Sequence, residues 1–585
     1  MKTNMILSAS GWRKVFAIGG QEQDKTSMIG EDNIAISIYA AKVFADYVKK
    51  QTGKEKPEIL VGMDARPTGP AIAEAAIKTF VSENVNVKFA GITAAPEIMA
   101  FSRGSDGFMY ISASHNPVGH NGIKFGLNAG GVLNGTENAK LVKEFTALCE
   151  QDEAQKKAFD LIQGIEEKKI AQIYEERPTN KAKALESYRA FLKWTISASE
   201  EEESQKRIFE LLKKAASKKK ISVVVDMNGS ARADSVDEDF FAENGIGFYA
   251  IHNKAGEIAH EIIPEAENLI YVAQEMERLQ KMGHSDAVLG YMPDCDGDRG
   301  NIVYWDDKEK KAVILKAQQV FSLSVLSELA YQNYLGKEKP CVVVNCPTSM
   351  RIEEIAGKFG AQVFRAEVGE ANVVNLAAEK RAEGFDVRIF GEGSNGGTIT
   401  YPSAVRDPIN TVFAIIKLLN IKELYETWCK KSNCECKDNY TLTDILASLP
   451  AYTTTGVSDP RAVLHIETKD HGELKARFQK IFEKQWIEQK VFLENYGIFS
   501  YECDITNGTK EIRGETEFRK SGKGGLKIKF LGRTSTPVAF IWMRGSGTEP
   551  VFRIMCDVKG NNSEMEKALL CWETEMLREA DKNQQ

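Results

Sequence analysis

The stretch GFMYISASHNP, residues 107–117, sets the pattern for the first third of the chain. Its five leading residues predict a buried strand, and the polar, proline-containing segment after them predicts where that strand ends. Two other strand-like runs precede it at residues 59–62 and 85–90, with a helical pattern between them at residues 71–81. Strands separated by helices of this length predict a layered α/β domain.

The same order of elements returns twice along the chain. ISVVVD at residues 221–226 is followed by a helical pattern and then by IGFY at residues 246–249. CVVVN at residues 341–345 is followed by a helical pattern at residues 351–359 and by AQVF at residues 361–364. Three comparable units predict internal structural repetition.

The end of the chain follows a different order. Residues 461–481 and 564–580 have helical spacing, whereas residues 499–504, 526–530 and 538–543 have the pattern of strands. This mixture predicts an α+β module. A length of 585 residues, at roughly 150 residues per domain, predicts about four domains. We place them at residues 1–180, 181–312, 313–430 and 431–585.

The composition is that of an ordinary globular protein with a small acidic excess. Hydrophobic residues make up 43% of the chain, and 76 basic against 83 acidic residues give a net charge of −7. Proteins that bind nucleic acids usually have a basic excess, so that class is disfavoured. An anionic ligand would need local basic or amide-lined pockets.

Three features bear on the compartment and the surface. No apolar run of about 18 residues is present, and residues 1–13 lack the apolar core of a secretory signal. The ten cysteines are scattered, which predicts reduced thiols and a cytoplasmic location. Cys429, Cys434 and Cys436 fit no common zinc-ligand spacing.

The polar residues 150–220 predict solvated connecting helices at the periphery rather than a binding tail.

The segment after the opening strand places a serine in a small, proline-locked turn. Such a turn can direct the hydroxyl of Ser114 into a cleft, where a base, a metal or a neighbouring charge makes it nucleophilic. An Asx/Pro turn with a capping serine explains the same residues equally well. The segment alone leaves both interpretations open.

The loop DCDGDR, residues 294–299, carries carboxylates at alternate positions. Asp294, Asp296 and Asp298 can converge on one hard cation, and without a cation they would repel one another. An EF-hand is excluded because its glycine and final glutamate positions hold other residues. Three carboxylates leave room for water or a phosphoryl oxygen, which suits Mg²⁺. A merely acidic surface turn is the alternative.

Two glycine-rich segments also carry polar chemistry. GEGSNGG, residues 391–397, follows a strand pattern but precedes no helix, so a dinucleotide-binding turn is excluded. Glu392 and Ser394 can instead bind sugar hydroxyls. RGSGTEP, residues 544–550, with Arg553 after it, combines backbone N–H groups, hydroxyls and bidentate charge, as in a phosphate cradle. Plain glycine turns are the alternative for both.

Together and in this order, the four segments resemble the α-D-phosphohexomutase superfamily, which contains phosphoglucomutases and phosphomannomutases. SGWRK at residues 10–14, VGMDAR at residues 61–66, Asn228-Gly229, and Pro264-Glu265 followed by ENL are similar to further landmarks of that family. The resemblance spans nearly the whole chain. It implies an α/β fold of three similar mixed-sheet domains plus a C-terminal α+β domain around a central cleft, with one loop from each domain.

The resemblance also implies a role for each matching residue. Ser114 would be the phosphorylated nucleophile, and the other catalytic residues would be His115, Lys124, Arg299 and Arg13. The ligands of Mg²⁺ would be Ser114, Asp294, Asp296 and Asp298. Glu392 and Ser394 would bind the sugar. The phosphate would be bound by Arg544, Ser546, Gly547, Thr548 and Arg553.

The implied activity is the interconversion of hexose 1-phosphate and hexose 6-phosphate, with glucose first and mannose second. Hexose 1,6-bisphosphate would be both intermediate and activator. The expected partners are small-molecule hexose phosphates, with neither nucleic acid nor a membrane, and the expected state is a monomer or homodimer.

The sequence leaves several alternative functions to consider. A phosphoglucosamine mutase and a non-catalytic sugar-phosphate-binding regulator on the same fold remain possible functions. Ala371 stands where many members have a basic residue, which leaves the identity of the sugar open. A serine hydrolase is disfavoured because Ser114 and His115 are adjacent and no G-x-S-x-G turn exists.

Overall fold

In the computed structural model, the stretch GFMYI forms strand β5 (Gly107–Ile111), and all five of its residues are buried. Met109 and Ile111 pack in one hydrophobic cluster with residues of helices α1 (Gly30–Thr52) and α2 (Gly69–Ser82). Phe108 and Tyr110 pack in a second cluster with residues of helix α3 (Ala95–Phe101). Because side chains alternate across a strand, helices on both faces require an apolar residue at every position.

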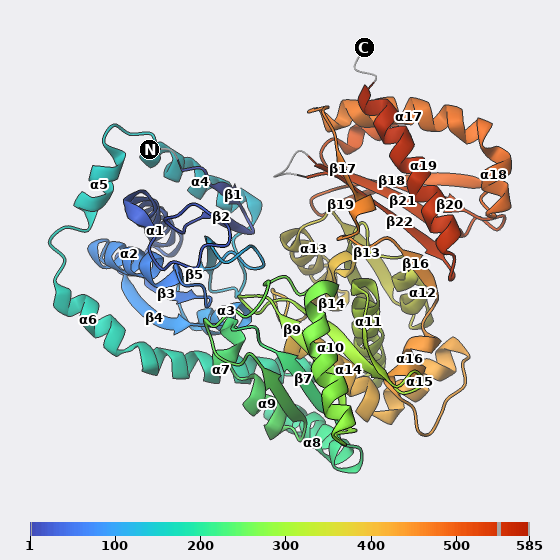
Figure 1. Cartoon of the computed structure of the whole chain (residues 1–585), viewed down its shortest axis with the longest axis horizontal. Helices are drawn as coiled ribbons and strands as arrows, with labels where there is room; N and C mark the ends of the chain where they lie inside the picture. Colours follow the sequence, from blue (N-terminus) through green and yellow to red (C-terminus); the bar gives the residue numbers. More distant parts are fainter. Residues whose placement is uncertain (2, 547–550, 583–585) are drawn as a thin grey trace. The chain divides into compact units, whose positions relative to one another are not determined.

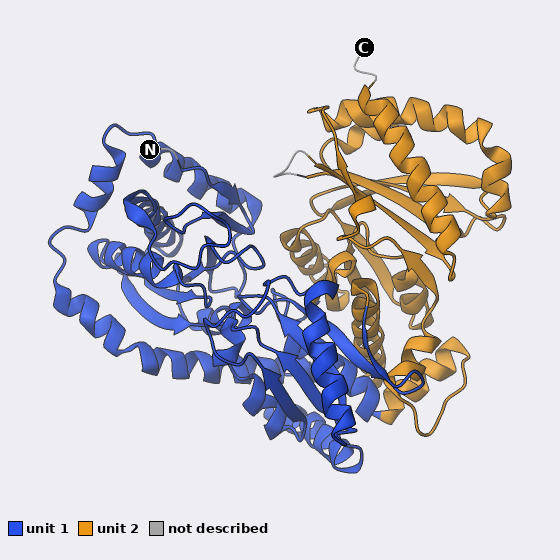
Figure 2. Cartoon of the chain, in the orientation of Figure 1, with its two compact units in different colours: residues 1–315, 399–421 blue, residues 316–398, 422–585 orange. Residues whose placement is uncertain are grey.

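The described part of the chain, residues 1, 3–546 and 551–582, forms two compact units (Figure 2). Unit 1 comprises Met1–Leu315 and Ile399–Ile421, and unit 2 comprises Lys316–Thr398 and Lys422–Gln585.

Unit 1 contains two mixed sheets (Figure 1). The six-stranded sheet has the order β1-β2-β6-β5-β3-β4, and the five-stranded sheet has the order β11-β10-β9-β7-β8. Their other strands are β1 (Ile6–Ser8), β2 (Gly11–Val15), β3 (Glu58–Met63), β4 (Asn86–Ile92), β6 (His120–Leu127), β7 (Ser222–Asp226), β8 (Gly247–Ile251), β9 (Ala287–Pro293), β10 (Gly300–Asp306) and β11 (Lys311–Ile314).

Unit 2 contains a four-stranded sheet of order β13-β12-β14-β15, apart from the last two residues of β15, which are assigned to unit 1. It also contains a seven-stranded antiparallel sheet of order β16-β22-β21-β20-β18-β19, with β17 paired to β22. Their strands are β12 (Pro340–Asn345), β13 (Gln362–Ala366), β14 (Asp386–Glu392), β15 (Gly397–Thr400), β16 (Tyr452–Thr454), β17 (Val463–His465), β18 (Ser500–Asn507), β19 (Lys510–Arg513), β20 (Gly525–Leu531), β21 (Pro537–Gly545) and β22 (Val551–Lys559).

Helices accompany each sheet. The other helices of unit 1 are α4 (Gly135–Cys149), α5 (Ala154–Leu161), α6 (Glu167–Glu175), α7 (Arg177–Ser197), α8 (Glu202–Lys218), α9 (Asp237–Glu243), α10 (Ala266–Lys281) and α14 (Pro408–Asn420). Those of unit 2 are α11 (Ala317–Tyr334), α12 (Arg351–Lys358), α13 (Glu370–Ala382), α15 (Lys422–Ser432), α16 (Leu442–Ser448), α17 (His471–Glu488), α18 (Lys490–Asn495) and α19 (Ser563–Lys582).

The three mixed sheets share one strand order. Their common parts are β4-β3-β5-β6, β8-β7-β9-β10 and β13-β12-β14-β15. In each, the first strand of the repeat lies between the second and the third, and the fourth lies beyond the third. The predicted repetition and the α/β class with an α+β end are therefore confirmed. The serine, aspartate and sugar loops all join the third strand of a repeat to the fourth.

Two expectations from the sequence were wrong. Residues 461–481 do not form one helix, because β17 pairs with β22 and Asp470 caps α17 by accepting from the N–H groups of Gly472 and Glu473. Residues 177–197 are not peripheral, because Tyr188 and Leu192 of α7 are fully buried.

Residues 399–421, which the sequence analysis placed in the third domain, belong to unit 1. Phe413 of α14 packs against Phe209, Phe240 and Phe241, with ring centroids 5.4 to 6.3 Å away. The hydroxyl of Tyr188 donates to Asp407 just before α14. The four proposed domain boundaries themselves stay a prediction.

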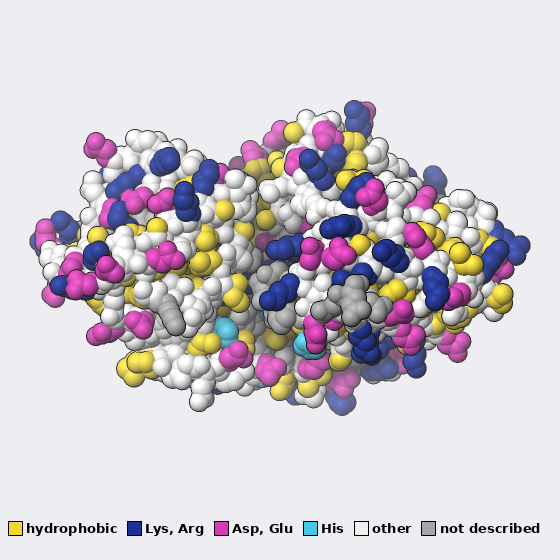
Figure 3. Space-filling view, turned by 90° about the horizontal axis from the view of Figure 1, so that it is seen from above, with side chains coloured by type: hydrophobic (Ala, Val, Ile, Leu, Met, Phe, Trp, Pro, Cys, Tyr) yellow, Lys and Arg dark blue, Asp and Glu magenta, His cyan; other side chains and the backbone are white. Residues whose placement is uncertain are grey.

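The surface carries charges of both signs. On the face shown in Figure 3, Lys and Arg side chains are interspersed with Asp and Glu side chains. All ten cysteines are free thiols. Within residues 1, 3–546 and 551–582, none of the helices combines the length and apolarity needed to cross a membrane.

Replacing Tyr188 tests whether α7 supports unit 1. The Tyr188 hydroxyl donates to Asp407 at 2.7 Å and accepts from Arg232 at 3.1 Å. Tyr188→Phe leaves both charged groups short of a buried partner, so the free energy of unfolding should fall by about 1–3 kcal/mol. Tyr174→Phe on α6, where the ring is half-buried, is the matched control. Urea unfolding followed by circular dichroism measures both, and equal midpoints for the two variants would contradict the role of α7.

Candidate active site

The serine loop between β5 and β6 holds Ser114 in a backbone conformation that L-residues rarely adopt. Ser114 has φ +55°, and its amide donates a 2.8 Å hydrogen bond to Oγ of Ser112. The carbonyl oxygens of Ser114 and Asn116 both accept from the buried guanidinium of Arg66, which pairs with Asp64. Such backbone strain costs about 1–3 kcal/mol and persists where the surroundings hold it. This loop is built to fix the position of one side chain.

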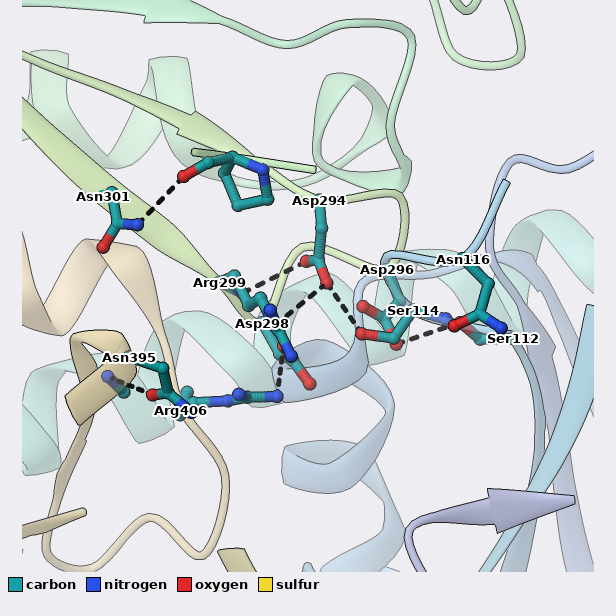
Figure 4. Close-up of polar contacts among 12 residues, drawn as sticks. Ser112, Ser114, Asn116, Asp294, Asp296, Asp298, Arg299, Asn301, Asn395 and Arg406 are labelled. Carbon is teal, nitrogen blue, oxygen red and sulfur yellow. Dashed lines mark hydrogen bonds and ion pairs between the residues drawn. The ribbon is translucent and has the colours of Figure 1, made fainter. Parts of the chain in front are cut away.

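The loop between β9 and β10 places three buried carboxylates beside this serine (Figure 4). Asp294, Asp296 and Asp298 offer oxygens that lie within 4.8 Å of one another. The Ser114 hydroxyl donates to Oδ2 of Asp294 at 2.7 Å. The Ser112 hydroxyl donates to Oδ2 of Asp296 at 2.9 Å. Unit 1 thus brings together the serine and the three aspartates that the sequence analysis selected.

Burial and mutual repulsion perturb these carboxylates. The pKa of Asp294 is raised to about 7, first by burial and then by the charges of Asp296 and Asp298. Burial also disfavours ionisation of Asp296, but its contacts with Lys124 and Ser112 outweigh burial and lower its pKa. Oδ1 of Asp296 is buried without a hydrogen-bond partner among the described residues. Crowded carboxylates with an unsatisfied oxygen form the donor set that a hard divalent cation prefers.

Lys124 on β6 supplies a fixed positive charge to the aspartate loop. Its Nζ lies 2.7 Å from Oδ2 of Asp296 and 3.8 Å from Oδ2 of Asp298. Burial alone would lower the pKa of this ammonium, but the two aspartates outweigh burial and raise it. Lys124 is therefore charged at neutral pH, and it acts as a hydrogen-bond donor rather than as a base.

Three arginines make the surroundings of His115 strongly positive. The pKa of His115 is lowered to about 2, first by burial and then by the charges of Arg299, Arg13 and Arg406. Nε of Arg13 is buried without a hydrogen-bond partner in the described part of the chain. With Lys124, these cations outnumber the three aspartates. An excess of positive charge around a largely buried site indicates a site for an anion such as a phosphoryl group.

Arg406 is a residue of this site that sequence reasoning missed. Its guanidinium donates to Oδ1 of Asp298 at 2.8 Å (Figure 4). It lies in the loop before α14, where Asp407 accepts from the N–H of Ile409 and Pro408 occupies the first turn. These helix-start residues are the one local signal, and they predict a cap rather than a role for the arginine.

The sugar loop in unit 2 is held by a second missed residue, Asn345 at the end of β12. Nδ2 of Asn345 donates to Oε1 of Glu392 at 3.2 Å and to Oγ of Ser394 at 2.8 Å. The N–H of Gly369 donates to the same Glu392 oxygen at 2.7 Å. Both side chains predicted to bind sugar are buried, and they lie close enough to share one amide donor. The sequence marked Asn345 only as the end of a strand.

The phosphate loop lies between β21 and β22. Arg544 and Arg553 face each other across this strand pair, and the N–H of Ser546 donates to the carbonyl of Val551 at 2.8 Å. Nε of Arg544 lies 3.1 Å from Oε1 of Glu367. The ends of the two strands therefore bring two guanidinium groups and one serine to the same loop. Gly547 and Thr548, predicted for the same site, lie outside the described residues.

Two family models match parts of the chain. One is described as phosphoglucomutase/phosphomannomutase, alpha/beta/alpha domain I, and matches residues 20–152. The other is described as domain III of the same family and matches residues 321–432. The first match includes the serine loop, and the second includes the sugar loop.

Two relatives, both named as phosphosugar mutases, match about two thirds of the chain or more. A phosphoglucomutase/phosphomannomutase of Thermococcus kodakarensis is 24% identical over 525 residues, 88% of this chain and 89% of its own. A phosphoglucosamine mutase of Methanococcus vannielii is 23% identical over 66% of this chain and 73% of its own.

Two solved structures share the fold. A phosphoglucomutase/phosphomannomutase family protein of Burkholderia thailandensis has a TM-score of 0.60 and 17% identity, covering 98% of this chain and 96% of its own. The open form of parafusin, a phosphoglucomutase of Paramecium, has a TM-score of 0.59 and 15% identity, covering 98% of each chain.

Metal titration tests the aspartate loop directly. The double substitution Asp294→Asn/Asp298→Asn removes two of three carboxylates, so affinity for Mg²⁺ or its probe Mn²⁺ should fall by about 100-fold or more. Asp239→Asn on the exposed surface of α9 is the control and should bind like the wild type. Isothermal titration and Mn²⁺ electron paramagnetic resonance measure the binding. Unchanged affinity in the double variant would show that the cation binds elsewhere.

Proposed function

Because this chain belongs to the α-D-phosphohexomutase superfamily of intramolecular phosphotransferases, we propose that it interconverts hexose 1-phosphates and hexose 6-phosphates. Glucose phosphates are the first proposed substrate and mannose phosphates the second. The name of the Thermococcus kodakarensis relative, which matches 88% of this chain, supports that choice.

One observation carries the proposal. The Ser114 hydroxyl lies 2.7 Å from a carboxylate oxygen of the aspartate triad, in surroundings that hold Lys124 and the arginines whose charges lower the pKa of His115. A serine that alternately carries and releases a phosphoryl group needs that combination. Cations stabilise the dianion when it is present, and the carboxylates can hold a metal against it.

The candidate active-site residues of unit 1 each have a proposed role. Ser114 would carry the phosphoryl group, and Asp294, Asp296 and Asp298 would hold Mg²⁺ together with it. When bound, Mg²⁺ offsets the negative charge on the phosphoryl oxygens during transfer. The positively charged side chains would bind those same oxygens, and neutral His115 would donate its ring N–H. The positively charged side chains are Lys124, Arg13, Arg299 and Arg406.

The residues of unit 2 would bind the rest of the substrate. Glu392 and Ser394 would accept and donate hydrogen bonds to ring hydroxyls, and Arg544, Ser546 and Arg553 would bind the phosphate that the substrate already carries. Gly547 and Thr548 belong to the same proposed loop.

The proposed reaction balances without a second substrate. The O–P bond of phosphoserine breaks as a bond forms to the free sugar hydroxyl, and the proton of that hydroxyl ends on Oγ of Ser114. The bisphosphate then returns its other phosphoryl group to Ser114, and the proton moves back to the sugar oxygen that is released. Added hexose 1,6-bisphosphate would restore an enzyme that has lost its phosphoryl group.

A second candidate sugar is glucosamine. The relative from Methanococcus vannielii is named a phosphoglucosamine mutase, and the substitution at Ala371 bears on sugar recognition. Both candidates use the same phosphoserine chemistry, so they differ only in the hexose that unit 2 would bind.

Coupled assays of glucose 1-phosphate, mannose 1-phosphate and glucosamine 1-phosphate decide among the sugars. With Mg²⁺ and a trace of the matching bisphosphate, glucose 1-phosphate should have the highest kcat/KM. Ser114→Ala should lower kcat/KM by a factor of about 10⁴ or more, because the acceptor oxygen is lost. Ser102→Ala, which removes another buried hydroxyl of unit 1, should stay near wild type. Equal turnover by Ser114→Ala and wild type would exclude the phosphoserine and leave a non-catalytic or different role.

Arg544 tests the phosphate loop. Arg544→Ala removes a charged hydrogen-bond donor to the resident phosphate, so KM for the preferred sugar phosphate should rise by about 10- to 100-fold. Arg513→Ala on the exposed edge strand β19 is the matched control. Steady-state kinetics measure both, and an unchanged KM for Arg544→Ala would assign the phosphate to other residues.

A further inference from the structure

Unit 1 holds a second cluster of metal-ligating side chains outside the serine and aspartate loops. Asp226 at the carboxyl end of β7, His252 after β8 and His260 in the following loop offer ligand atoms within 4.8 Å of one another. Oδ1 of Asp226 lies 2.9 Å from Nδ1 of His252, and Oδ2 lies 2.8 Å from Nε2 of His260.

Asp226 is a fully buried carboxylate that lacks the cation its counterpart has. In the first repeat, Asp64 follows the equivalent strand β3 and pairs with the guanidinium of Arg66. The second repeat has the same turn, in which the N–H of Asn228 donates to Oδ1 of Asp226 at 2.9 Å. Asn228 is neutral, however, so it does not supply the charge that Arg66 supplies in the first repeat. Within the described chain, the ion-pair partners of Asp226 are the two histidines. A buried carboxylate needs a compensating positive charge, and beside Asp226 that charge comes either from a second proton on an imidazole or from a bound cation.

The hydrogen bonds of His260 locate where that charge belongs. Its Nδ1 lies 3.0 Å from the backbone carbonyl oxygen of Glu261. A carbonyl oxygen only accepts, so Nδ1 carries the proton, and in neutral His260 the lone pair of Nε2 then points at the Asp226 carboxylate. Two lone pairs directed at each other across 2.8 Å repel, so either a second ring proton or a metal ion must lie between them. A ring N–H fixed by a backbone carbonyl is also the usual support of a metal-bound histidine.

The surrounding residues hold the ligands in place. The ring of Tyr271 stacks on His260 with centroids 4.2 Å apart. Asn228 fixes the loop of His260, because its side chain donates to the carbonyls of His260 and Glu261 and accepts from the N–H groups of Ala259 and His260. The Asn228-Gly229 pair selected from the sequence thus anchors this loop to β7.

We propose that Asp226, His252 and His260 form a binding site for one divalent transition metal ion, with Zn²⁺ the favoured ion. Two imidazoles and one carboxylate are a donor set of zinc sites, whereas Mg²⁺ prefers oxygen ligands alone. In a tetrahedral site with bonds of about 2.1 Å, neighbouring ligand atoms lie about 3.4 Å apart. The carboxylate–imidazole pairs, now 2.9 and 2.8 Å apart, therefore need to separate by roughly half an ångström.

The proposed metal site is open to solvent on one side, and a bound ion would affect the structure around it. The His252 side chain is 37% exposed, which leaves a path for the ion and for water ligands. His260 also lines a cavity of about 180 Å³ together with His115 of the serine loop. A bound ion would therefore fasten the loop between β8 and α10 to the sheet and fix one wall of that cavity.

Cobalt titration of the full-length, chelator-treated protein tests the site. Excess Mg²⁺ is kept present to saturate the aspartate triad, and Co²⁺ is followed by its visible d–d absorption, with Zn²⁺ content measured by mass spectrometry after desalting. The wild type should bind one ion per chain at this site, and Zn²⁺ should raise its melting temperature. His252→Gln/His260→Gln and Asp226→Asn should each lower the affinity by at least about tenfold.

Two controls and one alternative complete the test. His284→Gln removes another histidine of the same sheet region, which contacts Tyr249, and it should keep the spectrum and affinity of wild type. The single variant His252→Gln changes an exposed ligand and keeps the test valid if the double variant fails to fold. The proposal is overturned if the wild type binds no Co²⁺ under excess Mg²⁺, as expected for a protonated histidine in place of a metal. Equal binding by wild type and ligand variants overturns it as well.

Discussion

The crowding of three buried carboxylates in the β9–β10 loop is the constraint from which the rest of unit 1 follows. Their oxygens lie within 4.8 Å of one another, and like charges at that distance in a buried site are unstable without compensation. The compensation comes from separate parts of the chain, with Lys124 from β6 and Arg406 from the returning segment 399–421. The same crowding raises the pKa of Asp294 and makes the loop suited to a divalent cation.

The repeated sheets show how one architecture provides different chemistry. Each repeat has the same strand order, and each has a polar residue at the end of its first strand. Asp64 pairs with the arginine that holds the serine loop. Asn345 holds Glu392 and Ser394. Asp226 instead meets two histidines, and this difference is the basis for the proposed zinc site.

The sequence predicted the residues of the candidate site loops, but it did not predict the residues that hold those loops in place. Ser114, the three aspartates and Glu392 stand out because they are polar residues grouped at strand ends, where the local pattern changes abruptly. Asn345 and Arg406 act through partners far along the chain, so nothing in their local sequence distinguishes them from ordinary strand and loop residues. Similarly, the high average charge of residues 150–220 concealed the buried face of α7. The pairing of β17 with β22 overrode the helical spacing of residues 461–470.

Transfer of label from bisphosphate to the serine loop is the most direct test of the central claim. The protein is incubated with hexose 1,6-bisphosphate labelled with ³²P, then quenched and digested, and the labelled peptide is sequenced. We expect one label per chain on Ser114, which is lost when unlabelled glucose 1-phosphate is added before the quench. Label on another residue, or label on Ser114 that added sugar phosphate does not remove, would contradict it.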